Sequence, residues 1–251
     1  MKDLYIKTKD GDMFYKKYGD GPCVILLHGW GQNSETFESV INDLKNSYKV
    51  YVVDFLGFGL SDESENGIKV KDYSEHLKEL VDEEDIVNPI IIGHSFGGRV
   101  AIDYASKNSV KKLILVNSAG IRHRGIKYYF KVIKYKVKKI FVYLFNYDNY
   151  YSFIRKNSSR DYRNLSDNMR KTFKNVINKD LKKEMKKIDC DTLIISSVLD
   201  KEVPVKDGEI MKKLIRNSEL VLFYRSRHFS YIDEESKFIR VVRGFIDNWC
   251  Y

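Results

Sequence analysis

The sequence predicts an α/β protein with a mostly parallel, doubly wound sheet and an inserted helical cap. Strand-like and helix-like segments alternate along residues 1–118, and the alternation resumes along residues 188–251. Several strand-like segments are continuous aliphatic runs, which is typical of strands covered by helices on both faces. Between residues 119 and 187 the alternation stops, and the chain becomes rich in Lys, Tyr and Asn with a helical period. We therefore expect a core of residues 1–118 and 188–251 and a helical cap sub-domain of residues 119–187.

The elements follow in order along the chain. Residues 4–8 and 13–18 flank the turn Lys9-Asp10-Gly11-Asp12, so they form a hairpin that supplies an antiparallel edge. Apolar, β-branched runs predict central parallel strands at 23–27, 49–55, 89–92, 110–116, 192–198 and 220–224. Apolar residues at helical spacing predict helices at 34–48, 73–81, 99–107, 205–215 and 231–249. Ser34 is the expected N-cap of the first of these helices.

Composition restricts the class of protein. With 43% hydrophobic and 14% aromatic residues, the chain can bury a core, which excludes a disordered protein. Since it holds no apolar run of about 18 residues and does not start like a signal peptide, we expect neither a membrane-spanning helix nor secretion. Cys23, Cys190 and Cys250 are far apart and lack metal-ligand spacing. A reduced, cytoplasmic protein without a metal or organic cofactor is the expectation.

Charge is unevenly distributed. The net charge is +9, but residues 121–187 alone hold 20 Lys and Arg against 5 Asp and Glu. The remainder of the chain is therefore mildly acidic. This asymmetry indicates two structural units with different surfaces. No nucleic-acid recognition motif accompanies the basic segment, so a nucleic-acid partner is not expected.

The strongest chemical signal is Gly93-x-Ser95-x-Gly97 between a predicted strand and a predicted helix. A tight strand-to-helix turn of this kind exposes the serine Oγ and holds its backbone in an unfavourable conformation. The flanking glycines are needed because side chains there would collide with neighbouring segments. Ser95 is therefore the candidate nucleophile.

A serine nucleophile needs a base and an acid that orients the base, and after this turn the expected order is Ser, Asp or Glu, then His. Asp200 ends a predicted strand, and His228 follows the next one. Both lie at carboxyl ends of parallel strands, where open α/β sheets bind ligands. Of the five histidines, His228 alone follows the acid. Asp200 and His228 are the predicted partners of Ser95.

The chemistry of a carbonyl substrate also needs donors for the oxyanion that develops. The backbone N–H of Phe96 directly follows the nucleophile and is one candidate. The loop His28-Gly29-Trp30-Gly31, after an earlier strand, supplies Trp30 as the other.

These motifs, together with Asp54-Phe55-Leu56-Gly57-Phe58-Gly59 and Pro204, resemble the α/β-hydrolase superfamily over nearly the whole chain outside the insert. The resemblance is to small capped bacterial serine hydrolases, which include esterases, carbon–carbon bond hydrolases and haloperoxidase-like enzymes. It implies a Ser95-His228-Asp200 triad under a cap, with Asp54 ordering its loop rather than reacting. Arg227 stands where the family often has glycine. Ser95, where some relatives carry Asp, argues against epoxide hydrolase or haloalkane dehalogenase chemistry.

Residues 126–145 predict a basic amphipathic helix in the cap. Its lysines can form a solvated face, adsorb to an anionic membrane, or steer an anionic substrate, and the sequence leaves these alternatives open. Eight tyrosines indicate an aromatic-lined pocket and a small-molecule substrate with an apolar or aromatic portion: Tyr128, Tyr129, Tyr135, Tyr143, Tyr147, Tyr150, Tyr151 and Tyr162.

The function expected from the sequence is a carboxylesterase-like serine hydrolase of the EC 3.1.1 class. Two alternatives remain open at this point. A carbon–carbon bond hydrolase or lyase could use the same three residues, and a ligand-sensing regulatory protein could retain the scaffold.

Overall fold

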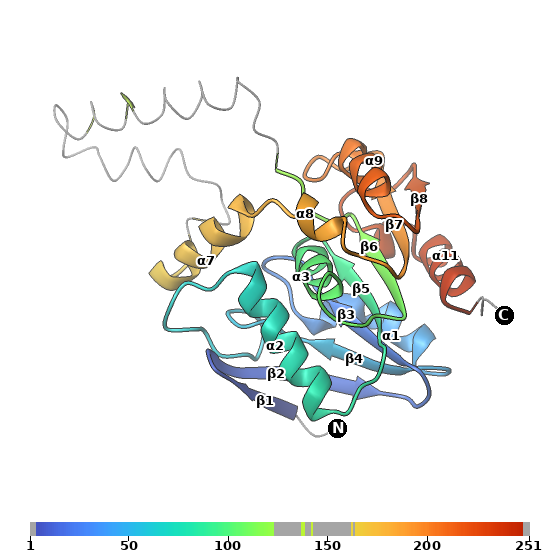
Figure 1. Ribbon diagram of the computed structural model, residues 1–251, viewed down its shortest axis with the longest axis horizontal. Helices are drawn as coiled ribbons and strands as arrows, with labels where there is room; N and C mark the ends of the chain where they lie inside the picture. Colours follow the sequence, from blue (N-terminus) through green and yellow to red (C-terminus); the bar gives the residue numbers. More distant parts are fainter. Residues whose placement is uncertain (1–3, 123–136, 139–141, 143–161, 163, 248–251) are drawn as a thin grey trace.

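The computed structural model describes residues 4–122, 137–138, 142, 162 and 164–247. In this part of the chain, eight strands form one sheet in the order β1-β2-β4-β3-β5-β6-β7-β8 (Figure 1). The strands are β1 (Leu4–Thr8), β2 (Gly11–Tyr18), β3 (Cys23–Leu27), β4 (Lys49–Val53), β5 (Ile90–His94), β6 (Lys112–Val116), β7 (Asp191–Ser197) and β8 (Ser218–Phe223). The pairs β1–β2 and β2–β4 are antiparallel, and the other neighbours are parallel. The predicted fold class, with its antiparallel edge hairpin, is confirmed.

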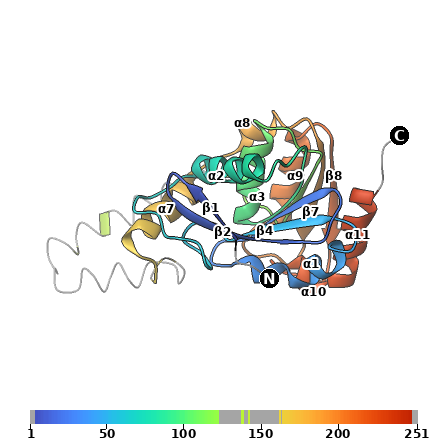
Figure 2. The same ribbon diagram turned by 90° about the horizontal axis from the view of Figure 1, so that it is seen from below.

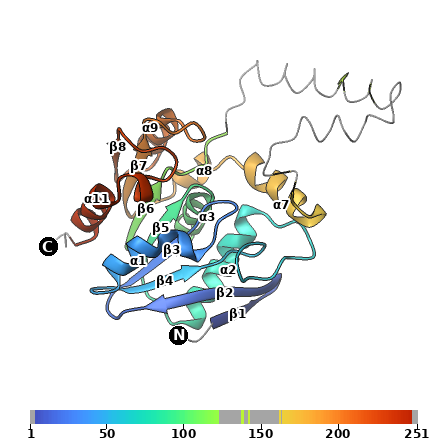
Figure 3. The same cartoon turned by 180° about the vertical axis from the view of Figure 1, so that it is seen from behind.

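Helices cover both faces of this sheet (Figure 2). One face carries α2 (Val70–Glu83), α3 (Phe96–Ala105), α8 (Lys182–Met185) and α9 (Val205–Leu214). The other face, seen in Figure 3, carries η1 (Ser34–Phe37), α1 (Glu38–Leu44), α10 (Ser230–Asp233) and α11 (Glu235–Asp247). A further helix, α7 (Asp167–Asn178), lies at one end of the molecule beside the loop that precedes α2.

Two cores form because successive side chains of a strand point to opposite faces. In β3, Ile25 and Leu27 belong to the cluster under α2 and α3. Their neighbours Val24 and Leu26 belong to the cluster under α1 and α11. All four side chains are fully buried, which explains why this strand reads as an unbroken aliphatic run.

Several helix boundaries differ from the predictions. The predicted helix 34–48 is a 3-10 turn followed by the shorter α1, and its N-cap is Asn33, whose side chain accepts from the N–H of Glu35. The prediction of Ser34 as the cap is wrong by one residue, because the backbone of Asn33 is the one in the extended conformation that a cap needs. The helices α2 and α3 both start three residues earlier than predicted.

The predicted C-terminal helix is interrupted at Glu234, which leaves the helical conformation with φ −130° and ψ 50°. The acidic residues around this break bond to the loop after β8. Asp233 Oδ2 accepts from the N–H of Arg227 at 2.7 Å, and Glu234 Oε2 accepts from the N–H of Arg225 at 3.0 Å. The break thus satisfies backbone donors of the loop that carries His228.

Most of the predicted cap lies outside the described residues, including the basic helix 126–145 apart from residues 137, 138 and 142. Within its described part, Leu181 and Met185 are buried in the same core cluster as α3 and α9. The boundaries of the cap sub-domain therefore stay a prediction. Among the helices that the structure describes, none is long and apolar enough to cross a membrane.

Candidate active site

The turn between β5 and α3 holds Ser95 in a strained backbone conformation, with φ 50° and ψ −106°. Such a conformation is rare for a residue other than glycine and is concentrated at functional sites. The positions on either side of Ser95 are glycines because a side chain would not fit there. A Cβ on Gly93 would lie 2.7 Å from the carbonyl oxygen of Gly97, and a Cβ on Gly97 would lie 2.1 Å from that of Leu27. Side chains at either position would push the turn away from its neighbours.

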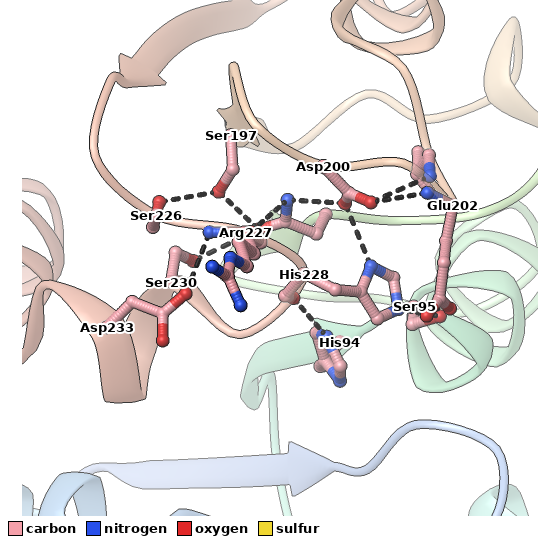
Figure 4. A network of polar contacts seen from close by, with 12 residues as sticks. His94, Ser95, Ser197, Asp200, Glu202, Ser226, Arg227, His228, Ser230 and Asp233 are labelled. Carbon is pink, nitrogen blue, oxygen red and sulfur yellow. Dashed lines mark hydrogen bonds and ion pairs between the residues drawn. The ribbon is translucent and has the colours of Figure 1, made fainter.

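The structure brings the three predicted catalytic side chains together from the loops after β5, β7 and β8 (Figure 4). His228 Nε2 lies 3.0 Å from Ser95 Oγ. On the other side of the ring, His228 Nδ1 lies 2.8 Å from Asp200 Oδ2. Because a carboxylate only accepts, Nδ1 carries the proton, and the Nε2 of a neutral ring is free to accept the Ser95 proton.

Four donors surround the Asp200 carboxylate. Its Oδ1 accepts from the backbone N–H groups of Glu202 at 2.7 Å and Val203 at 3.0 Å. Its Oδ2 accepts from His228 and, at 2.8 Å, from the side-chain amide of Asn117. Burial by itself would raise the pKa of Asp200, but the hydrogen bonds from His228 and the two backbone N–H groups outweigh burial and lower it. The carboxylate is therefore ionised at neutral pH.

The two predicted oxyanion donors are neighbours. Phe96 directly follows Ser95 and is the first residue of α3. Its backbone N–H therefore has no acceptor within the helix. Trp30 lies in the loop after β3, and its ring meets the Phe96 ring edge to face at 5.5 Å. The rings of Phe58 and Phe173 pack against Trp30 at 4.9 and 5.1 Å. An aromatic cluster thus adjoins the nucleophile.

His28 is a buried histidine with a defined proton position. Its Nδ1 lies 2.7 Å from the carbonyl oxygen of Gly29, and its Nε2 lies 3.0 Å from the N–H of Phe55. Since the carbonyl only accepts and the N–H only donates, the ring is neutral with its proton on Nδ1. Burial lowers the pKa of His28 to about 4. Gly29 has no room for a side chain, because a Cβ there would lie 2.8 Å from His94 Nδ1.

Asp54 fastens the two loops beside His28 and does not reach the triad. Its Oδ1 accepts from the N–H of Ser34 at 2.6 Å, and its Oδ2 accepts from the N–H of Leu60 at 2.9 Å. Its carboxylate lies so close to Gly59 that a Cβ there would overlap it. These contacts are those of a residue that orders loops.

Three further residues of the site were missed by the sequence interpretation: Asn117, described above, His94 and Glu202. His94 is buried, and its Nε2 donates to the carbonyl oxygen of His228 at 2.9 Å. Glu202 has a side chain that is 70% exposed, and its Oε2 lies 3.3 Å from His228 Nε2. A second carboxylate therefore lies beside the atom that faces Ser95.

The helix α7 reaches the aromatic cluster from the insert. Phe173 supplies the contact with Trp30, and two polar side chains of α7 bond to the loop before α2. The N–H of Ile68 donates to Thr172 Oγ1 at 3.1 Å, and Asn175 Nδ2 donates to the Ile68 carbonyl at 3.2 Å. Of the tyrosines expected to line a pocket, Tyr162 alone is described, and its ring lies 5.9 Å from that of Phe173. The other predicted tyrosines lie outside the described residues.

Comparisons with known proteins agree with this architecture. The family profile described as alpha/beta hydrolase fold matches residues 22–131. The chain is 28% identical to the AB hydrolase superfamily protein YisY of Bacillus subtilis, over 96% of this chain and 98% of that protein. It is 25% identical to a pimeloyl-[acyl-carrier protein] methyl ester esterase of Legionella pneumophila, over 92% of this chain and 97% of that protein.

A solved structure shows the same fold at lower identity. The esterase EaEST from Exiguobacterium antarcticum superposes with a TM-score of 0.76 at 22% identity, covering 95% of this chain and 96% of that one. The sequence profile, the full-length relative and the superposed structure all indicate an α/β hydrolase. The chain therefore has the α/β-hydrolase fold, and its profile match and full-length relative are both α/β hydrolases.

Proposed function

We propose that this protein is a serine hydrolase that cleaves carboxylic esters, with Ser95 as nucleophile, His228 as base and Asp200 as the acid that orients it. The single observation that carries the proposal is the continuous hydrogen-bond chain from Ser95 Oγ through His228 to Asp200, built on a strained turn. A serine that only links two segments by hydrogen bonds rarely needs a strained backbone conformation, whereas an exposed nucleophile in a tight strand-to-helix turn does.

In the first half of the reaction, Ser95 Oγ attacks the carbonyl carbon of the ester while His228 Nε2 takes the hydroxyl proton. The carbonyl π electrons move to its oxygen, which accepts hydrogen bonds from the backbone N–H groups of Phe96 and Trp30. When the tetrahedral intermediate collapses, the bond to the leaving oxygen breaks and His228 returns the proton to it. An alcohol leaves, and an acyl group stays on Ser95.

In the second half, water attacks the acyl carbon and gives a proton to His228 Nε2. Collapse of the second intermediate releases the carboxylic acid and restores the Ser95 hydroxyl with that proton. Throughout, the ionised Asp200 stabilises the imidazolium that forms and keeps Nδ1 protonated.

The aromatic cluster supports a substrate with an apolar portion. Trp30 and Phe173 are both partly exposed, so their rings offer apolar surface beside the nucleophile. Two of the similar proteins described above carry esterase in their names, which favours an ester over an amide or a carbon–carbon bond.

The test is hydrolysis of p-nitrophenyl esters of increasing acyl length by wild type, Ser95→Ala and Ser106→Ala. Ser106 is the matched control because it lies at the far end of α3, where its Oγ bonds to the Asp103 carbonyl. We expect turnover to fall by several orders of magnitude in Ser95→Ala and to stay at the wild-type level in Ser106→Ala. Labelling of Ser95 by a fluorophosphonate, detected by mass spectrometry, would show the covalent step.

Equal turnover in Ser95→Ala and wild type would refute the mechanism. Wild-type protein that cleaves none of the esters and resists the label would refute the esterase proposal. That outcome would favour the carbon–carbon, lyase or ligand-sensing alternatives.

A further inference from the structure

Asn117 occupies an unusual position directly after β6. It is buried, and its backbone is in the left-handed region with φ 43°. Asparagine tolerates this region better than most residues do, yet the conformation still carries strain. The preceding residue, Val116, accepts from the N–H of Ser95 at 3.0 Å, and the N–H of Asn117 donates to Ile195 in β7 at 2.8 Å. The backbone therefore places this side chain between the nucleophile strand and the acid strand.

The carboxamide of Asn117 connects the two loops that carry the acid and the base. Its Nδ2 donates to Asp200 Oδ2 at 2.8 Å and, at the longer distance of 3.5 Å, to the carbonyl of Arg227. Its Oδ1 accepts from Ser230 Oγ at 3.0 Å and from Ser197 Oγ at 3.2 Å. Ser197 precedes Asp200 by three residues, and Ser230 follows His228 by two.

The orientation of this amide follows from its partners. Because the ionised Asp200 only accepts, the NH2 group of Asn117 must face it, and Oδ1 must face the two serines. Ser197 then donates to Oδ1, which leaves its oxygen to accept from Ser226 Oγ at 2.7 Å. The hydroxyl chain reinforces a single orientation of the amide.

We propose that Asn117 is a positioning residue of the triad: its amide donor aims the Asp200 carboxylate at His228, and its amide oxygen ties the acid loop to the histidine loop. The inference rests on the proposed function. Asp200 Oδ2 receives two hydrogen bonds, one from His228 and one from Asn117. Without the second, Oδ2 depends on His228 alone, and only the backbone N–H groups that bond to Oδ1 restrain the carboxylate when the histidine moves.

A residue that merely fills space and one that supplies a donor respond differently to substitution. Asn117→Asp keeps the size, shape and accepting oxygen, but it places a second carboxylate oxygen against Asp200. Asn117→Ala leaves a small cavity in which water can take over the donation. A space-filling role therefore predicts the greater loss in the alanine variant, whereas a donor role predicts the greater loss in the aspartate variant.

The experiment measures kcat and KM for the best p-nitrophenyl ester with both variants and with Asn88→Asp. Asn88 is the matched control, since it is an exposed asparagine whose backbone is also left-handed, with φ 49°. We expect kcat of Asn117→Asp to fall by about 30-fold or more, with KM changed by less than about threefold. We expect a smaller fall in Asn117→Ala and none in Asn88→Asp. An alanine variant slower than the aspartate variant, or an aspartate variant with wild-type kcat, would overturn the proposal.

A second readout does not depend on turnover. The proton on His228 Nδ1, hydrogen-bonded to Asp200, should give a resonance far downfield in the 1H NMR spectrum of the resting enzyme. We expect this resonance to be lost or shifted upfield in Asn117→Asp and kept in Asn88→Asp. If wild type hydrolyses no ester, the proposed function fails, and the resonance still tests Asn117. If Asn117→Asp does not fold, Ser230→Ala replaces it, with an expected fall in kcat of about threefold or more and an unchanged kcat as the contradicting result.

Discussion

Two buried histidines of the site should make the fold sensitive to mild acid. Burial lowers the pKa of His28 to about 4. Burial, with a smaller contribution from the neighbouring His228, lowers the pKa of His94 to about 3. In the unfolded chain each ring takes up a proton near pH 6.5. Between these values the unfolded state binds protons that the folded state cannot bind.

The sign of the effect follows from proton linkage. When the unfolded state holds more protons, the free energy of unfolding rises with pH, so these two groups destabilise the fold as the pH falls below about 6.5. From pH 8 to pH 5, each histidine should remove about 2 kcal/mol, or about 4 kcal/mol for the two. The carboxylates whose pKa is lowered, such as Asp200 and Asp180, lose their contribution at more acidic pH, so this window reports on histidines.

Urea unfolding followed by far-UV circular dichroism at pH 8, 7, 6 and 5 measures this dependence. The variant His94→Gln isolates one ring, because its amide can still donate to the carbonyl of His228 that His94 reaches at 2.9 Å. We expect the variant to be less stable than wild type at pH 8 and to lose about 2 kcal/mol less on going to pH 5. An equal loss in both proteins would refute the assignment of His94 as a neutral buried ring.

Two further substitutions test other parts of the site. Asp54→Asn should lower the free energy of unfolding, measured by urea titration, by about 2 kcal/mol, because the new amide NH2 group faces one of the two backbone N–H groups that Asp54 now accepts from. The control Asp85→Asn, in an exposed loop, should change this free energy little. Glu202→Gln tests substrate charge with two substrates, 4-acetoxybenzoate, which is anionic, and its methyl ester, which is neutral. The ratio of kcat/KM for the anionic substrate to kcat/KM for the neutral one should rise about threefold in the variant, because the exposed carboxylate beside His228 repels anionic leaving groups. An unchanged ratio would show that this carboxylate has no part in selecting substrates.

The parallel sheet was predictable because its strands are buried on both faces. A run such as residues 23–27 has no polar side to misplace, and the alternation of such runs with helical patterns along the chain leaves few topologies. Helix ends were harder to predict. Asn33 and Ser34 are both good N-caps by residue type, and only the backbone conformation, set by tertiary contacts, selects Asn33. The break at Glu234 depends likewise on a loop that is distant from any local pattern.

The meeting of Ser95, Asp200 and His228 at one edge of the sheet was predictable because each follows the carboxyl end of a strand in a fixed chain order. Asn117 obeys the same rule, since it follows the aliphatic strand β6, and this position was the available signal. It was overlooked because an amide carries no reactive chemistry of its own. Its proposed role comes from four partners on the two segments that carry the acid and the base. No spacing rule connects such residues, and only the folded backbone brings them together.

The insert is fastened to the same helix that starts at the nucleophile. Arg99, in the first turns of α3, donates to the carbonyl oxygen of Lys179 at 2.8 Å, and the N–H of Leu181 donates to the carbonyl oxygen of Gly120 at 2.9 Å. Burial lowers the pKa of Arg99 to about 10, so the guanidinium is charged at neutral pH. Because removing a partner from a buried charge is strongly unfavourable, the two ends of the insert stay joined to each other and to α3.

This anchoring separates two properties of the enzyme. The loops of the triad and the ends of the insert belong to one packed frame, in which a change of residue would disturb several hydrogen bonds at once. Between those ends, the described helix α7 contacts the frame where Phe173 meets Trp30 beside the nucleophile. Side chains there can change the surface offered to a substrate without touching the Ser95, His228 and Asp200 contacts. We therefore expect substitutions in α7 to change which substrate is preferred, and substitutions in the frame to change the reaction itself.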